Sequence, residues 1–142
     1  MPLISVKIGD HCYHGLCDMG ASASAIPIDL YKEIMHDIAP AELEEIDVTI
    51  KLANRDTISP IGIFRDVEVL CGKTKYPADF LVLGSPQDSF CPIISGRPFL
   101  NTVNAKIDYE KDVVTIGLGD MSHEFNFSKF HRQHREEELP SK

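Results

Sequence analysis

The chain has 142 residues, enough for one hydrophobic core and too few for a second substantial one. Its 22 acidic residues outnumber its 14 lysines and arginines, and this negative excess argues against a surface that binds nucleic acid irrespective of sequence. No apolar run approaches the ~20 residues that span a bilayer, and no basic-then-apolar segment opens the chain, so we expect an intracellular, cytoplasmic protein with no membrane partner.

The four cysteines give no signature of a metal site or a disulfide framework. Cys12, Cys17, Cys71 and Cys91 form no C-x-x-C pair, and a chain of this length folds without covalent links. We expect them to be small buried side chains in a reducing compartment, with disulfides as the minority alternative.

The first predicted element is a β-hairpin. Residues 3–8 alternate between apolar and polar, Gly9-Asp10 is a turn signal, and residues 11–17 return as a second strand. That strand leads directly into Asp18-Met19-Gly20, where the glycine allows a sharp turn of the backbone. The sequence therefore places Asp18 at the end of an apolar strand.

A short helix and a second hairpin are expected next. Pro27 suits the first turn of a helix over residues 28–36. Residues 48–52 and 57–58 are predicted strands joined by a turn at residues 53–56, whose Asn and Asp favour that conformation. We expect this second hairpin to project from the rest of the domain.

The remainder of the chain predicts further short strands at residues 67–70, 76–83 and 91–94. A turn into a helical segment follows at residues 95–98, and another hairpin is expected over residues 105–116. Short, regularly spaced strands indicate an all-β barrel or sandwich. We expect one domain over residues 1–118. A polar extension, 119–142, follows; it can add one strand at residues 123–127 and is otherwise expected to be partly disordered.

Asp18 and its neighbours supply the first chemical signal. An aspartate at a strand end, followed by Gly20-Ala21-Ser22, is a partly buried carboxylate among small residues that let another backbone approach. Taken alone, an Asp-x-Gly turn is common and usually structural.

Two segments, in order, change that interpretation: Cys17-Asp18-Met19-Gly20-Ala21-Ser22 and Ile93-Ile94-Ser95-Gly96-Arg97-Pro98-Phe99-Leu100. The first resembles the catalytic loop of the retropepsin family, the retroviral and retrotransposon proteases, and the second its apolar-apolar-x-Gly-Arg signature. The resemblance is greatest to Ty3/gypsy-type proteases of plant retroelements and covers residues 1 to about 118. Residues 48–63 occupy the place of the flap hairpin.

The resemblance implies a retropepsin-like closed acid-protease barrel with one or two short helices and one lobe per chain. Because only one Asp-x-Gly-Ala occurs in the sequence, the second aspartate of such a site must come from another chain, so we expect a homodimer. Two facing carboxylates cannot both ionise, and the shared proton lets the Asp18 pair activate a water against a peptide bond without a metal or cofactor.

The resemblance also implies how a peptide or polyprotein substrate would lie in the site. An extended substrate would add as a strand between the floor of the site and the flap. The implied substrate contacts are Gly20, Ala21, Ser22, Leu52, Ala53, Asn54 and Ile94. Gly96 and Arg97 are expected to support the catalytic loop structurally, with a substrate clamp as the alternative role for Arg97.

Met19 and Ser95 depart from the family pattern. Thr or Ser is usual at position 19, where its hydroxyl bonds across the dimer, and a thioether cannot donate that bond; plant relatives commonly have Leu there. Ser95 stands where relatives usually have a larger apolar residue, and we expect looser packing beneath Asp18. These departures motivate an alternative function, a catalytically silent retropepsin-fold module for dimerisation or peptide binding.

Other chemistries have weaker support in the sequence. His11 and His14 point to opposite faces of a strand, which argues against a metal site with Cys12 and Cys17. No histidine is placed to activate Ser22 or Ser24 as a nucleophile. The expected function is therefore a homodimeric aspartic endopeptidase that processes a retroelement polyprotein.

Overall fold

A computed structural model describes residues 2–35, 43–51, 57–84 and 93–128, and six strands of this part form a closed barrel in the order β1-β2-β8-β3-β7-β6. The barrel strands are β1 (Leu3–Ile8), β2 (His11–Cys17), β3 (Ser24–Pro27), β6 (Gly62–Cys71), β7 (Thr74–Leu83) and β8 (Ile93–Ser95). Two short helices, α1 (Ile28–Met35) and α2 (Arg97–Thr102), accompany it among the described residues. The predicted all-β barrel is confirmed.

The β1–β2 hairpin forms as predicted, and its turn contains Gly9 at a φ of 60°. Alternate residues of β1 enter the core, where Ile4, Val6 and Ile8 are buried. On its other side β2 pairs in parallel with β8, and Cys17 lies opposite Ser95. This pairing brings the two segments singled out in the sequence side by side.

Strand β3 is a correction to the sequence prediction. Its four residues are all buried, and they pair in parallel with β7 and at one position with β8. Pro27, predicted in the first turn of the helix, instead ends β3, and α1 begins at Ile28. A short strand buried on both faces has no period-two alternation, so the pattern of polar and apolar residues could not reveal it.

The β6–β7 hairpin is the longest in the barrel, and its turn lies at Gly72 and Lys73, as predicted. A β-bulge interrupts the pairing between Phe64 and Val67, and Asp66 within it has a φ of 54°. Bulges add a residue to one strand and turn side chains away from their regular direction. Arg65 and Asp66 are both exposed at this point.

Helix α1 packs its apolar side on the barrel, as the sequence predicts. Leu30 and Ile34 are buried, and the ring of Tyr31 meets Phe64 edge to face with centroids 5.1 Å apart. The core continues through Phe80 and Phe99 to the barrel's other side.

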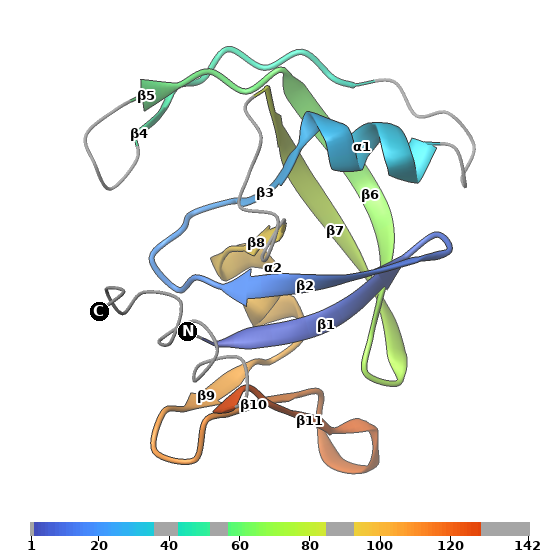
Figure 1. Ribbon diagram of the computed structural model, residues 1–142, viewed down its shortest axis with the longest axis vertical. Coiled ribbons are helices and arrows are strands. Elements are labelled where there is room, and N and C mark those ends of the chain that lie inside the picture. Colours follow the sequence, from blue (N-terminus) through green and yellow to red (C-terminus); the bar gives the residue numbers. More distant parts are fainter. Residues whose placement is uncertain (1, 36–42, 52–56, 85–92, 129–142) are drawn as a thin grey trace, which may run out of the picture.

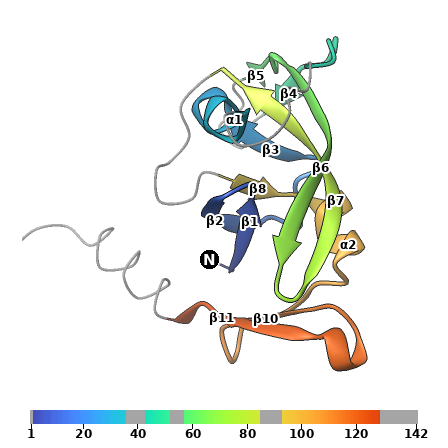
Figure 2. The same cartoon turned by 90° about the vertical axis from the view of Figure 1, so that its right-hand side faces the viewer.

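Two smaller sheets lie at opposite ends of the long axis of the molecule (Figures 1 and 2). At one end β4 (Ile50–Lys51) pairs with β5 (Thr57–Ile58), which are the two strands of the predicted projecting hairpin; its turn, residues 52–56, lies outside the described residues. At the other end β10 (Val113–Ile116) pairs with both β9 (Lys106–Asp108) and β11 (His123–Asn126), and the 3-10 turn η1 (Gly119–Met121) joins β10 to β11.

Packing against the barrel continues past residue 118. Strand β11 forms where the sequence allowed one, and the following Phe127 is 1% exposed within the main core. The end of the polar extension, residues 129–142, and residues 85–92 lie outside the described part of the chain. In that part, no helix has both the length and the apolar character to cross a membrane.

Candidate active site

Asp18 is held by hydrogen bonds to both its backbone and its carboxylate. The Asp18 N–H donates to the carbonyl oxygen of Ser95 at 2.9 Å, which continues the β2–β8 pairing by one residue. The Gly20 N–H donates to Asp18 Oδ1 at 3.0 Å, and the Ala21 N–H donates to the Asp18 carbonyl at 3.1 Å. The half-buried side chain is therefore held at a strand end, with its carboxylate aimed by the following turn.

Residues 18–23, named here the Asp18 loop, have a glycine at their third position, next to the carboxylate. A Cβ added to Gly20 would lie 3.3 Å from Asp18 Oδ1, tighter than ordinary contact. Gly20 and Ser22 are exposed, whereas Ala21 is half-buried. The loop thus presents backbone and small side chains around one carboxylate.

Arg97 contacts three consecutive residues of the Asp18 loop through their carbonyl oxygens. Its Nη1 donates to Met19 at 3.2 Å and to Gly20 at 3.5 Å, and its backbone N–H donates to Ala21 at 2.9 Å. Arg97 therefore bonds to the backbone of the Asp18 loop within the same chain. The Met19 side chain is 48% exposed.

Gly96 lies in the closest backbone contact of the site. A Cβ added there would lie 2.4 Å from the carbonyl oxygen of Ala23 and 3.0 Å from that of Ala21. The Gly96 N–H donates to Ser24 Oγ at 3.0 Å in a buried hydrogen bond. Only glycine allows the two chain segments to approach this closely.

Ser24 is a supporting residue that the sequence analysis did not assign to the site. It is 3% exposed and satisfies the buried Gly96 N–H, so it joins the end of the Asp18 loop to the start of α2. Ser24 begins strand β3, which the sequence pattern did not reveal, and nothing in the sequence indicated its partner 72 residues away.

The β2–β8 pair explains the small residue at position 95. Ser95 is 2% exposed, and a Cβ added to Gly15 would lie 2.9 Å from Ser95 Oγ. Gly15 and Ser95 therefore share a space that has no room for an additional carbon. Ile94, the neighbouring signature residue, is half-buried and pairs with Leu16 and Ala25.

The structure brings together Asp18, Met19, Gly20, Ala21, Ser22, Ile94, Gly96 and Arg97 on adjoining segments. The predicted flap contacts Leu52, Ala53 and Asn54 lie outside the described residues. The described ranges hold no group of three or more histidine, cysteine, aspartate or glutamate residues arranged to bind a metal ion.

No protein-family model matches the sequence. Among solved structures, the chain is similar to the crystal structure of the retroviral protease-like domain of Ddi1 from Leishmania major, with a TM-score of 0.61 and 17% sequence identity. The alignment covers 99% of this chain and 98% of that one. The predicted retropepsin-like fold is thereby confirmed, and the Asp18 loop lies on a barrel of the kind found in retroviral protease-like domains.

Proposed function

We propose that the protein is an aspartic endopeptidase whose active site forms between two copies of the chain, each contributing Asp18. The observation that carries this proposal is Asp18 at a strand end of a retropepsin-like fold, with its backbone N–H bonded to Ser95 and its carboxylate bonded to the Gly20 N–H. Fold alone does not fix a reaction, so the proposal depends on this site.

The proposed dimer supplies the second catalytic carboxylate, which a single chain lacks. Asp-x-Gly-Ala occurs once in the sequence, whereas the reaction needs two carboxylates. Met19 and Gly20 are exposed at the tip of the Asp18 loop, so a second copy can approach the carboxylate there. Two aspartates at close range would then share one proton.

The dyad would act by general acid–base catalysis. The ionised oxygen takes a proton from a water as that water attacks the peptide carbonyl, and the protonated partner donates first to the developing oxyanion and later to the leaving amine. The β4–β5 hairpin, at the end of the molecule opposite the three-stranded sheet, would close over an extended substrate as a flap and exclude water (Figure 1).

The substrate class is proposed from the sequence signatures. Their resemblance to Ty3/gypsy-type proteases supports a retroelement polyprotein as substrate, cut in an intracellular, cytoplasmic setting. Cleavage of an unstructured polypeptide is the direct test, over about pH 4 to about pH 7 because a shared proton limits the active pH range.

The decisive comparison uses Asp18→Asn beside the control Asp29→Asn, which removes an exposed carboxylate from α1. Wild type and control should cleave equally, and Asp18→Asn should lose about 10³-fold or more in kcat/KM. Equal cleavage by all three proteins would refute the proposal. Excess Asp18→Asn copies should also inhibit wild type, because mixed dimers contain one aspartate; undiminished activity would refute the shared site.

Met19 favours a second candidate function, a catalytically silent module that dimerises and binds peptides. Its exposed side chain offers a thioether where the retropepsin family usually carries a hydroxyl and the plant relatives commonly carry Leu. This candidate predicts dimers that bind peptide and cleave none under any condition. Cleavage that depends on Asp18 would exclude it.

A further inference from the structure

A cavity of about 340 Å³ lies beside the Asp18 loop. It is lined by Ala23 and Ser24 at the end of that loop, by Pro98 and Phe99 at the start of α2, and by facing residues of β6 and β7. Its walls are mainly apolar, and the charged residues among them are Arg65, Asp66 and Asp79. The cavity thus adjoins the proposed active site without containing Asp18.

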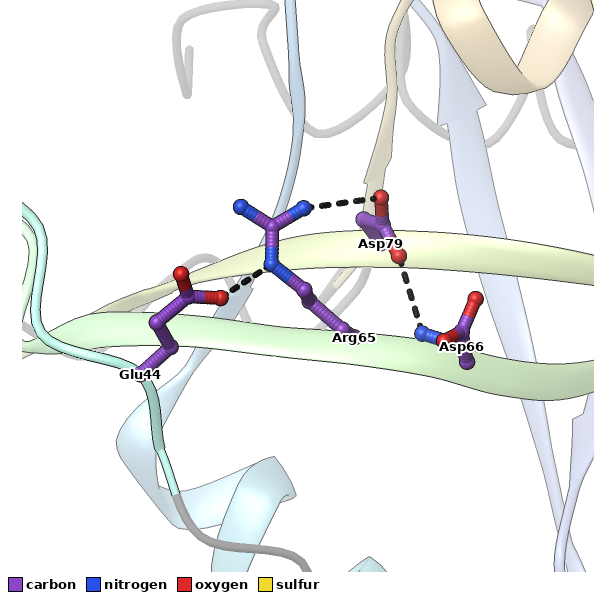
Figure 3. Close-up of polar contacts among 4 residues, drawn as sticks. All are labelled: Glu44, Arg65, Asp66 and Asp79. Atoms are coloured by element: carbon purple, nitrogen blue, oxygen red, sulfur yellow. Dashed lines mark hydrogen bonds and ion pairs between the residues drawn. The ribbon is translucent and has the colours of Figure 1, made fainter.

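The charged residues of the cavity belong to a cluster of four (Figure 3). Arg65 Nε donates to Glu44, and Arg65 Nη1 lies 3.5 Å from Asp79 Oδ2. The Asp66 N–H donates to Asp79 Oδ1 at 2.8 Å, which fixes the bulge of β6. Glu44 is held in place by paired backbone bonds to Ile63, at 2.9 and 3.0 Å.

The balance of charge in this cluster is negative. The cluster holds three carboxylates and one guanidinium; Glu44 and Asp79 contact Arg65, whereas Asp66 joins through its backbone N–H, and the hydrogen bond and charge of Glu44 raise the pKa of Arg65 above its ordinary value. The positive charge of Arg65 is therefore already paired with the carboxylates of Glu44 and Asp79. A cavity with apolar walls and excess carboxylate suits a side chain with an aliphatic stem and a cationic head, as in lysine and arginine.

The position of the cavity suits a residue of the substrate itself. Ala23 follows Asp18 by five residues, which span at most about 18 Å when fully extended. A peptide bound as a strand advances about 3.3 Å per residue. An extended substrate cut above Asp18 therefore reaches the cavity within about five residues of the cleaved bond.

We propose that this cavity is a distal subsite that selects substrates with lysine or arginine within about five residues of the cleaved bond. The inference rests on the proposed protease function, because it assumes that the peptide lies across Asp18. It assigns specificity to Asp66 and Asp79, which take no part in the reaction itself.

The test uses peptide sets that differ at one position, with arginine, its neutral isostere citrulline, or glutamate placed three, four or five residues from the cleaved bond. Cleavage gives kcat/KM, and a matching set with a reduced, uncleavable bond gives Kd. At one of these positions arginine should give a kcat/KM about two- to fivefold higher than citrulline and a Kd lower by a similar factor. The difference should shrink in about 0.5 M salt.

The matched variant is Asp66→Asn combined with Asp79→Asn. Asparagine tolerates the positive φ of position 66, and its Oδ1 at position 79 can still accept the bulge N–H, so the backbone should be retained. The double variant should lose the preference for arginine, Arg65→Gln should increase it, and the exposed control Asp120→Asn should leave it unchanged.

Three outcomes would overturn the inference. The first is equal kcat/KM and Kd for arginine and citrulline at every position, the second is a preference that survives the double variant, and the third is binding that does not compete with substrate. Basic peptides that bind at Asp66 and Asp79 without competing with substrate would show an independent docking surface instead. If no peptide is cleaved, the proposed function fails, whereas the Kd series still tests the subsite.

Discussion

The guanidinium of Arg97 donates to the carbonyl oxygen of Met19 at 3.2 Å, across 78 residues of sequence. The Asp18 loop is therefore held within its own subunit through backbone acceptors, and the side chain at position 19 takes no part in these bonds. Arg97 therefore supports the geometry of the loop. The exposed side chain of residue 19 can instead make contacts to a second copy of the chain.

Met19→Thr should strengthen the proposed dimer and leave the monomer fold almost unchanged. The side chain is 48% exposed, so we expect the free energy of unfolding to change by less than about 0.5 kcal/mol. Two symmetric hydroxyl bonds across the interface should lower the dimer Kd about tenfold and raise kcat/KM at low protein concentration. Sedimentation equilibrium measures the Kd, and an unchanged value would contradict the prediction.

Arg97→Lys should reduce activity more than stability. Lysine keeps the charge, but its shorter, flexible side chain does not place a donor where the rigid guanidinium holds Nη1, which donates to both the Met19 and Gly20 carbonyls. We expect a loss of about tenfold or more in kcat/KM and about 1 kcal/mol in the free energy of unfolding. Urea unfolding and peptide kinetics measure the two quantities, and undiminished kcat/KM would exclude the supporting role of Arg97.

Gly96→Ala should destabilise the fold by about 3 kcal/mol, because the added Cβ would lie 2.4 Å from a backbone carbonyl oxygen that cannot move independently. The control is Gly84→Ala, where the added Cβ would meet the Ile61 side chain at an ordinary 3.5 Å. That change should cost less than about 0.5 kcal/mol in urea unfolding. Similar losses for both variants would contradict this account of Gly96.

Ser24→Ala should cost about 1 to 3 kcal/mol, because it leaves the buried Gly96 N–H without its acceptor. The matched change Ser22→Ala removes an exposed hydroxyl two residues earlier and should be nearly neutral. Thermal or urea unfolding compares them. If Ser24→Ala proves as stable as Ser22→Ala, the hydrogen bond does not support the site.

Cys71 should make stability fall at alkaline pH. Burial raises the pKa of its thiol to about 12, so the folded protein keeps a proton that the unfolded chain releases above about pH 8.5. Stability should therefore decrease with rising pH, by about 1 to 2 kcal/mol between pH 8 and pH 10. Cys71→Ala should lack this loss of stability at alkaline pH, and the exposed control Cys12→Ala should retain it. Urea unfolding at each pH measures the free energy of unfolding. The same dependence on pH in wild type and both variants would contradict the assignment to Cys71.

The sequence predicted those parts of the site at which the backbone conformation restricts the type of residue. Asp18 and Gly20 form a local turn, and Gly96-Arg97 marks a close approach that few other residues allow. The resemblance of these segments, in order, also predicted the barrel. Their contact through β2 and β8 is long-range and parallel, which no local pattern encodes.

The features that sequence missed depend on tertiary partners. Ser24 is explained only by the Gly96 N–H, and β3 only by its burial between β7 and β8. The cavity charges gave no signal either, because Glu44, Arg65 and Asp79 are ordinary surface residues until the β6 bulge and the β6–β7 pairing bring them together. The preference we infer for basic substrates arises from that assembly.

The parallel pairing of β2 with β8 also sets when the site can form during synthesis. Asp18 leaves the ribosome early, but the carbonyl that holds its N–H belongs to Ser95, and the guanidinium that holds the next residue belongs to Arg97. Contacts between residues this far apart form only after the long intervening loop closes. A nascent chain that ends before β8 therefore contains the aspartate without the structure that positions it.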